Sequence, residues 1–169
     1  EYSCPDEATM AMLFLVAYIF LLRLPSEAIP MVWGKVSAGT DASQHSQLWL
    51  EDDKLWLKLK SRKNKPKGSL LWRKCWCHEC TTTCPIHTFG YWASLHKEGE
   101  KLFPKITPSD ALFLLRTMLA DLRVQQAFSY RTHDLRRGHA RDLQSKGMPL
   151  HMILAAGEWR SPAFLDYLD

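Results

Sequence analysis

The chain has 169 residues, of which 46% are apolar, and it carries 22 Lys and Arg against 18 Asp and Glu. This length and composition suit a single domain that can bury a core, and they exclude a disordered tail, a collagen-like fibre and a cysteine-dense secreted scaffold. The formal net charge of +4 is too small to indicate a partner by itself.

The first predicted element is a buried helix. Residues 10–22 (MAMLFLVAYIFLL) form an unbroken apolar run that is too short for a bilayer span, which needs about 20 residues. The acidic residues Asp6 and Glu7 precede the run, whereas a secretory signal has basic residues there. We therefore expect an intracellular protein with no membrane partner, in which the five Cys are reduced.

A small sheet is predicted next. Apolar and polar residues alternate on both sides of Glu51-Asp52-Asp53, which is typical of a β-hairpin. The Lys, Pro and Gly residues of 60–69 predict a turn, and 69–76 predicts a third antiparallel strand. The stretch 54–74 contains nine Lys and Arg and no Asp or Glu. The rest of the chain therefore contains 13 basic residues and all 18 acidic residues. Such a segment favours docking of a polyanion, with a solvated charged hairpin as the alternative.

The remaining chain is predicted to be helical. Helices are expected at 85–97, at 108–122 with Thr107 as N-cap, at 132–147 with Thr132 as N-cap, at 149–156, and at 162–168 with Ser161 as N-cap. The order of elements predicts a mostly helical α+β fold with a small three-stranded antiparallel sheet.

The densest chemical signal is the pair His133 and Arg136. Residues three apart share one helix face, and His with Arg beside a helix N-terminus suits a phosphate, although a solvated helix face would also explain the pair. Arg23 follows the apolar run, the basic hairpin comes next, and Trp159 and Tyr167 lie downstream. Six Arg against two Asp within 116–141 make a second basic cluster around this pair.

Arg, hairpin Lys, H-x-x-R, Trp and Tyr in this order resemble the catalytic set of the tyrosine recombinases, the phage-integrase superfamily. The chain is most similar to Crypton-type recombinases of eukaryotic mobile elements, in the segments LLRLPSEAIPM, SRKNKPKGSLLWRKCWC, CPIH, YRTHDLRRGHARDL and GEWRSPAFLDYLD. The resemblance runs from about residue 10 to the last residue and implies a mostly helical recombinase catalytic domain over 1–169. It also implies that an N-terminal core-binding domain and a C-terminal extension are absent.

The resemblance implies a site-specific recombinase or integrase that cuts and rejoins DNA through a 3′-phosphotyrosyl intermediate, without a catalytic cofactor. The implied catalytic residues are Arg23, Lys63, His133, Arg136, Trp159 and Tyr167. The implied DNA contacts are Lys60, Arg62, Lys65, Lys67 and Arg137. Lys60 and Lys65 are alternatives to Lys63 as the acid for the leaving oxygen, and Tyr130 is a weaker alternative to Tyr167 because it precedes the H-x-x-R pair. An extra residue between Arg23 and Glu27 departs from the usual Arg-x-x-Glu and puts the role of Glu27 as buried support in doubt.

Four Cys and two His lie within 75–87, more than the four ligands of a tetrahedral zinc. The Crypton-type pattern favours Cys75, Cys77, Cys84 and His87 as ligands of a structural zinc, with Cys80 and His78 as alternates. Reduced thiols packed as small apolar groups are the other interpretation.

The resemblance further implies double-stranded DNA as the partner, a homo-oligomer on DNA, and location in the nucleus. Two alternatives stay open. The chain could be a domesticated, non-catalytic DNA-binding module of the same fold, or it could be a type IB topoisomerase-like enzyme that relaxes DNA alone.

Overall fold

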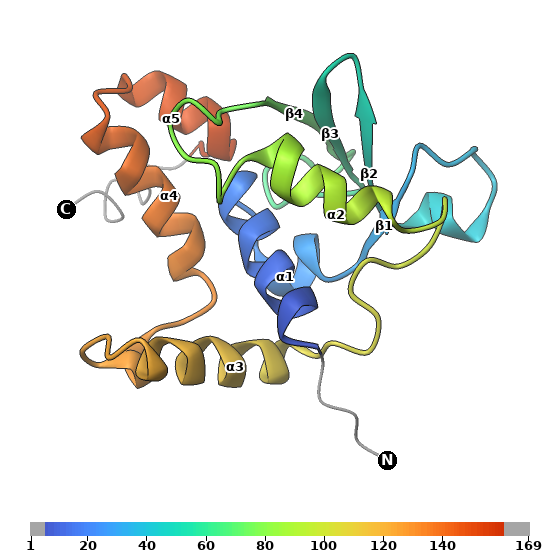
Figure 1. The fold of residues 1–169 in the computed structure, drawn as a ribbon. Helices are drawn as coiled ribbons and strands as arrows, with labels where there is room; N and C mark the ends of the chain where they lie inside the picture. The colour runs from blue at the N-terminus through green and yellow to red at the C-terminus, as the bar shows by residue number, and fades with distance from the viewer. Residues whose placement is uncertain (1–5, 161–169) are drawn as a thin grey trace. The chain divides into compact units, whose positions relative to one another are not determined.

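The computed structural model describes residues 6–160 (Figure 1), so the helix predicted at 162–168 and its cap Ser161 lie outside the described residues. The chain divides into two compact units. One, the helical unit, joins residues 1–25 to 105–169, and the other, the sheet unit, comprises residues 26–104.

The helical unit begins with α1 (Glu7–Ile19), which is the buried helix that the apolar run predicts. The Asp6 side chain caps it by accepting a hydrogen bond from the backbone N–H of Thr9, at 3.4 Å. Met10, Leu13 and Val16 are fully buried. The helix ends earlier than expected because Leu21 adopts a left-handed backbone conformation, with φ of 51°.

Four further segments complete the described part of the helical unit: α3 (Pro108–Asp121), the 3-10 turn η4 (Ala127–Ser129), α4 (Asp134–Ser145) and α5 (Leu150–Gly157). Thr107 caps α3 as predicted, in a capping box with Asp110. The predicted cap Thr132 is wrong, because His133 occupies the N-cap position of α4. The Asp134 carboxylate accepts a hydrogen bond from the Arg131 backbone N–H at 2.7 Å, which closes the turn that precedes the helix.

The core of the helical unit joins α1, α4 and α5. Leu21, Ala140 and Ile153 are buried together, with Leu143, Met148, Leu154, Ala156 and Trp159 packed against them. Tyr18 fastens α1 to α4, since its ring stacks on His139 with centroids 4.4 Å apart and its hydroxyl donates to Asp142 at 2.6 Å. These contacts pack the segment of α1 and Leu21 against α4 and α5.

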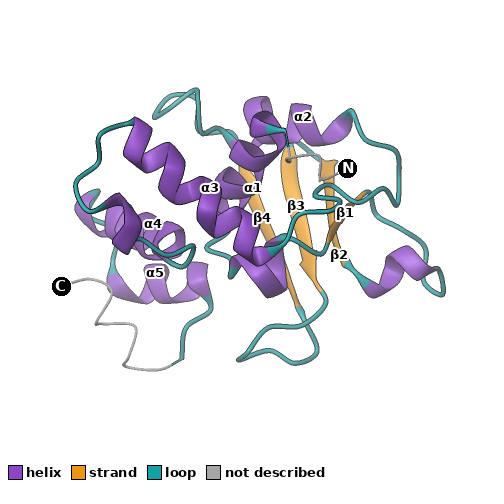
Figure 2. Ribbon diagram, turned by 90° about the horizontal axis from the view of Figure 1, so that it is seen from below, coloured by secondary structure: helices purple, strands orange, loops and turns teal. Residues whose placement is uncertain are grey.

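The sheet unit contains a four-stranded mixed sheet (Figure 2) with strand order β1-β2-β3-β4. The three expected antiparallel strands are present as β2 (Ser46–Glu51), β3 (Lys54–Leu59) and β4 (Ser69–Lys74). The count of three was wrong, because β1 (Met31–Trp33) pairs with β2 in parallel. Asp52 and Asp53 both have positive φ, which makes the two-residue hairpin turn that their position predicts.

Shorter helical segments surround the sheet: the π-helical turn η1 (Leu24–Ala28), which spans the boundary of the units, the 3-10 turn η2 (Asp41–Gln44), the π-helical η3 (Pro85–Gly90) and α2 (Tyr91–Ser94). η3 and α2 replace the single helix expected at 85–97. The leucine face of the sheet carries the fully buried Leu48, Leu55 and Leu57, and Gly90 lies against Leu50 on the same face. Within residues 6–160, no helix combines the length and the apolar character that crossing a bilayer requires.

Candidate functional site

The helical unit brings together four of the residues predicted to be catalytic. His133 is half-buried at the start of α4, and Arg136 is buried one turn further along. The charges of both Arg136 and Arg23 act on the His133 ring, which places the segment after α1 beside the start of α4. Trp159 joins them after the end of α5. Segments more than 100 residues apart in the sequence therefore meet at one site.

Arg136 is held in place by the end of α5. Its Nη2 donates a hydrogen bond to the carbonyl oxygen of Gly157 at 2.8 Å. The centre of its guanidinium lies 4.5 Å from the centroid of the Trp159 ring, within the range of a cation–π contact. A backbone acceptor and an aromatic face thus fix the orientation of the guanidinium of Arg136, a residue that is 3% exposed.

The electrostatics of this site favour an anion. Arg23, Arg136 and Arg137 all act on His133, and Asp134 is the carboxylate that opposes them. Arg137 Nη1 lies 3.5 Å from Asp134 Oδ1, so one of these cations is partly neutralised. Three guanidinium groups against one carboxylate leave a positive field at the start of α4, where the helix dipole also attracts negative charge.

The same surroundings keep His133 neutral. Burial lowers its pKa below the ordinary value of 6.5, and the positive charges of Arg136 and Arg23 lower it further. Asp134 acts in the opposite direction and does not reverse the shift. At neutral pH the imidazole therefore has one nitrogen that can accept a proton, as a general base requires.

Gly157 is a site residue that the sequence analysis missed. A Cβ atom at this position would overlap the six-membered ring of Trp159, so glycine is what allows the indole to lie against the end of α5. Its carbonyl oxygen is also the acceptor for Arg136. Sequence reasoning could not find it, because a backbone carbonyl leaves no signature in residue type.

We expect Gly157→Ala to destabilise the helical unit by about 1–3 kcal/mol, because the added methyl group must displace Trp159 from Arg136. Urea unfolding followed by circular dichroism measures the loss. Gly138→Ala is the matched control, since nothing lies within 4 Å of a Cβ at this position inside α4 and alanine favours a helix by up to about 1 kcal/mol. Equal stability of the two variants would contradict the assigned role of Gly157.

The hairpin loop between β3 and β4 carries the predicted lysines of the sheet unit. Lys60, Lys63 and Lys67 are exposed, and Lys65 is half-buried. Lys60 Nζ donates to Gln44 Oε1 at 3.1 Å. Backbone hydrogen bonds between Arg62 and Lys65, 2.9 Å in each direction, tighten the loop around Lys63. Lys63 is thus held at the tip of a constrained turn.

Arg62, a predicted DNA contact, is paired with a carboxylate inside the sheet unit. Its side chain is 3% exposed, and its Nε and Nη2 donate to the two carboxylate oxygens of Glu27, each at 3.1 Å. Both residues belong to the sheet unit. In the structure the contact of Arg62 is therefore a buried bidentate ion pair that ties the hairpin loop to η1, and its contact with DNA stays a prediction. The extra residue before Glu27 does not prevent a buried supporting role.

Tyr167, the predicted nucleophile, lies outside the described residues.

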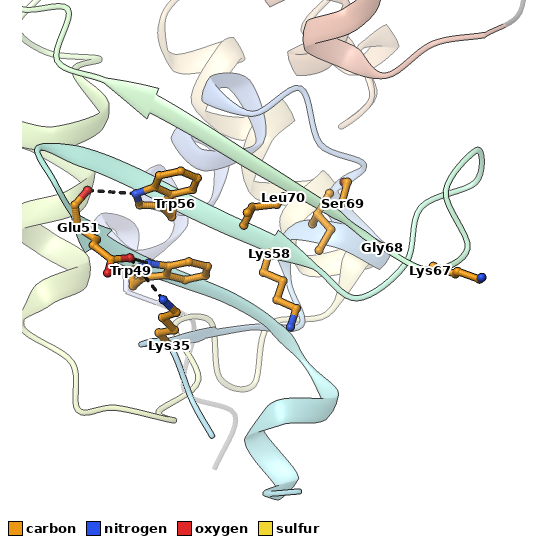
Figure 3. A pocket seen from close by; sticks show the side chains of 10 residues that line it. Lys35, Trp49, Glu51, Trp56, Lys58, Lys67, Gly68, Ser69 and Leu70 are labelled. Atoms are coloured by element: carbon orange, nitrogen blue, oxygen red, sulfur yellow. Dashed lines mark hydrogen bonds and ion pairs between the residues drawn. The ribbon is translucent and has the colours of Figure 1, made fainter. Parts of the chain in front are cut away.

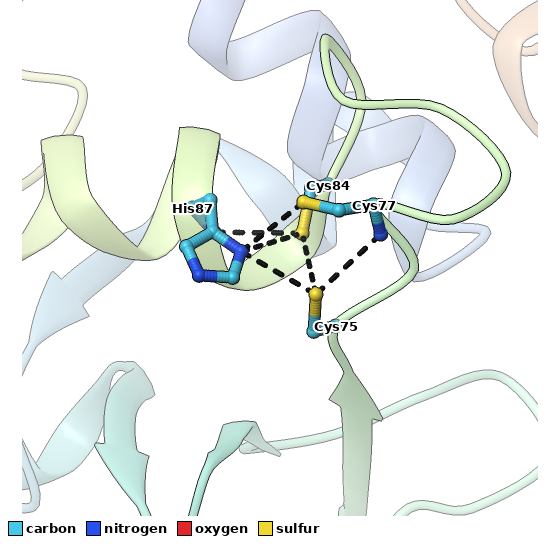
Figure 4. Close-up of side chains that lie close together, drawn as sticks. All are labelled: Cys75, Cys77, Cys84 and His87. Carbon is cyan, nitrogen blue, oxygen red and sulfur yellow. Dashed lines mark hydrogen bonds between the residues drawn. The ribbon is translucent and has the colours of Figure 1, made fainter.

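Cys75, Cys77, Cys84 and His87, the four favoured metal ligands, form a cluster that could hold a metal ion (Figure 4). Their ligand atoms all lie within 4.8 Å of one another. Cys84 Sγ is 3.7 Å from Cys75 Sγ, and His87 Nδ1 is 3.2 to 3.5 Å from the three sulfur atoms. A tetrahedral zinc with S and N ligands has edges of about 3.8 Å between sulfurs and about 3.6 Å from sulfur to nitrogen. These four distances are close to the edges of a tetrahedral site.

The local fold explains this arrangement. Cys75 and Cys77 follow the end of β4, while Cys84 caps η3 and His87 lies in its first turn. Burial raises the pKa of Cys84, but hydrogen bonds from the backbone N–H groups of His87 and Trp76 lower it, to a net value of about 6. A hydrogen bond with Cys84, and then burial, raises the pKa of Cys77 to about 12.

The two alternate ligands lie outside this cluster in the described part of the chain. Cys80 Sγ contacts Thr82 Oγ1 at 3.2 Å, and hydrogen bonds from Thr82 and Thr83 lower its pKa to about 7. His78 Nε2 lies 3.5 Å from Glu79 Oε1. The choice among six candidates that the resemblance made agrees with the set that the structure gathers.

Comparison with protein-family models, with curated proteins and with solved structures finds no match to this chain.

Proposed function

We propose that the chain is a site-specific recombinase that cuts and rejoins DNA strands by the chemistry of the tyrosine recombinases. The observation that carries the proposal is the convergence of Arg23, His133, Arg136 and Trp159 within the helical unit. Phosphoryl transfer requires a group that stabilises charge on the phosphate and a group that accepts a proton. An oriented guanidinium next to a neutral histidine can supply both. The proposal further implies double-stranded DNA as substrate, a homo-oligomer on DNA, and location in the nucleus.

In this proposal Arg23 and Arg136 bind the non-bridging oxygens of the scissile phosphate and stabilise the charge that develops on them. The phenol oxygen of Tyr167 attacks phosphorus, and His133 accepts the phenol proton. The bond from phosphorus to the 5′ oxygen breaks, and Lys63 gives that oxygen a proton. The new phosphotyrosyl bond preserves the phosphodiester energy for rejoining. The Trp159 indole N–H can donate a hydrogen bond but does not act as an acid or a base, so the part of Trp159 is to orient Arg136.

The proposal is tested with a nicked duplex that releases its 5′ fragment after cleavage and so traps the covalent intermediate. We expect the full chain to form a protein–DNA adduct that survives denaturation and is absent in Tyr167→Phe, because phenylalanine has no nucleophilic oxygen. Gel electrophoresis of labelled DNA measures it. Tyr130→Phe is the control and should form the adduct normally.

Three other results would overturn the proposal. Binding of the duplex without any adduct would favour the non-catalytic DNA-binding module. Relaxation of supercoiled DNA by the lone chain without strand exchange would favour the topoisomerase-like enzyme. An adduct that persists in Tyr167→Phe would assign the nucleophile elsewhere.

We also propose that Cys75, Cys77, Cys84 and His87 hold a structural zinc. The spacing of the donor atoms supports it, and so do the N–H groups of Cys77 and His87, which point at the sulfurs of Cys75 and Cys84 from 3.4 and 3.5 Å. With four protein ligands such a site is closed, so the ion would fasten the end of β4 to the start of η3 and would take no part in catalysis.

A further inference from the structure

The face of the sheet opposite the buried leucines carries a row of three tryptophans. Trp49, Trp56 and Trp72 are direct partners in the register of β2, β3 and β4. The ring centroids of the first pair lie 6.3 Å apart with nearly parallel planes, and those of the second pair lie 6.4 Å apart. Trp72 is 44% exposed, which is unusual for so large an apolar side chain.

Lysine ammonium groups surround this row. Lys54 Nζ lies 4.5 Å from the centroid of the Trp72 ring and 5.7 Å from that of Trp56. Lys35 Nζ lies 5.7 Å from the centroid of Trp49. Lys58 is exposed on the same face, because it is the register partner of Gln47 and lies two residues after Trp56. Trp49 is 8% exposed, so the aromatic surface that is open to solvent belongs to Trp56 and Trp72, with lysine ammonium groups beside it.

A pocket of about 510 Å³ opens beside the row (Figure 3). Trp49 and Trp56 form its apolar wall, and Lys35, Lys58 and Lys67 are the cations among its lining residues. Glu51 is the one carboxylate among the residues that line it. This carboxylate accepts the Trp49 indole N–H at 3.1 Å and lies 3.5 Å from Lys35, so it neutralises only part of the charge. The pocket is nucleotide-sized and positive.

We propose that this Trp/Lys face binds a single strand of nucleic acid, with bases stacked on the tryptophan rings and phosphates against the lysines. Any polyanion would satisfy the lysines, but a nucleic acid strand carries a flat aromatic base with every phosphate, which also suits the indoles of Trp56 and Trp72. In a duplex the flat faces of the bases are already stacked on one another, so only an unpaired strand presents them to a protein ring. Aromatic rings on a sheet, with lysines around them, can therefore bind the bases and the phosphates of an unpaired strand at the same time.

The contacts also indicate how selective the face is. The indole N–H groups of Trp49 and Trp56 already donate to the side chain and the backbone of Glu51, at 3.1 and 3.0 Å. These two indole N–H groups are therefore not available to a base, and the Trp56 ring offers only its π face. Stacking without hydrogen-bond readout tolerates any base, so the expected binding is independent of sequence and sensitive to salt.

Binding of fluorescein-labelled oligothymidine and oligouridine, each of about 12 nucleotides, to the full chain tests the proposal by fluorescence anisotropy at low salt. We expect Trp72→Leu to weaken binding about tenfold. Lys58→Glu should also weaken it and should reduce its salt dependence. The matched controls are Tyr91→Leu and Lys97→Glu, both exposed residues of the sheet unit outside the pocket, and both should bind as the unchanged chain does. Trp72→Phe keeps an aromatic face and should restore most of the affinity.

Several results would overturn the proposal. A loss in Lys58→Glu without any loss in Trp72→Leu and Trp56→Leu would mean a polyanion contact without stacking. Equal losses in the control variants would mean a general effect of charge or folding, and displacement by polyglutamate at equal concentration would mean an acidic protein partner. The proposed function fails separately, because a chain that forms no adduct can still bind these oligonucleotides.

Discussion

Replacing Arg62 by methionine is expected to lower the free energy of unfolding of the sheet unit by about 3–5 kcal/mol. The side chains of Arg62 and Glu27 are 3% and 2% exposed, so the substitution leaves a buried carboxylate without its bidentate partner. Urea unfolding followed by tryptophan fluorescence measures the loss. Six of the seven tryptophans lie within residues 26–104, so this signal reports mainly on the sheet unit.

Two further variants separate the ion pair from its surroundings. The double variant Glu27→Leu with Arg62→Met should recover most of the lost stability, because two apolar groups of similar volume leave no buried charge. Lys63→Met, an exposed neighbour, should change stability by no more than about 0.5 kcal/mol. If Arg62→Met were as stable as Lys63→Met and lost only DNA affinity, the contact first predicted for Arg62 would be restored and the structural role would be wrong.

Elements whose signals are local could be predicted from the sequence. The apolar run before Arg23 predicts α1, and the alternating residues around Asp52-Asp53 predict the β2–β3 hairpin. Thr107 and Asp110 predict the start of α3 because the capping box spans only four residues. In each case the physical cause and its effect lie within a few positions of each other.

Elements that depend on distant partners could not be predicted. The strand β1 has three residues, too few for a pattern, and its parallel pairing with β2 is a tertiary contact. The burial of Arg62 also depends on a distant partner, because Glu27 lies 35 residues before it. The lysines around Arg62 in the sequence suggest an exposed residue instead. At the start of α4, Thr132 has the right residue type for a cap, but His133 occupies the position.

In the candidate site, the residues could be predicted, but their orientation could not. The resemblance predicted Arg23, His133, Arg136 and Trp159 as one set, and the structure gathers them in the helical unit. It could not predict how Arg136 is oriented, since that depends on the Gly157 carbonyl and on the space that Gly157 leaves for the indole. For the cluster of Cys75, Cys77, Cys84 and His87, the resemblance made the choice among six candidates, and the structure gathers the four that it chose. Cys75 and Cys77 are two apart after a strand, and Cys84 and His87 are one helical turn apart.

Removal of the metal is expected to have the largest effect on the sheet unit. Structural zinc contributes about 10–16 kcal/mol of apparent binding free energy in small zinc-finger peptides, and part of it becomes folding free energy wherever the site forms only in the folded chain. Here the ion would join β4 to η3, which packs on the sheet, so its loss should free the loop between them. We expect the purified chain to contain about one equivalent of zinc and to lose thermal stability in a strong chelator.

Matched cysteine variants decide whether the four residues of the cluster are the ligands. Cys84→Ser removes a buried ligand and should leave less than about half an equivalent of zinc, with a lower unfolding temperature. Cys80→Ser removes a thiol four residues away that lies outside the cluster, and it should keep both the metal and the stability. Mass spectrometry of the bound metal and thermal unfolding measure the two effects. Equal zinc loss in both variants would assign the ligands differently, and a metal-free purified chain would leave the thiols as packed apolar groups. If Cys80→Ser keeps its zinc and Cys84→Ser loses it, Cys84 is a ligand and Cys80 is not. This is expected because only the thiol of Cys84 lies beside His87 in the cluster.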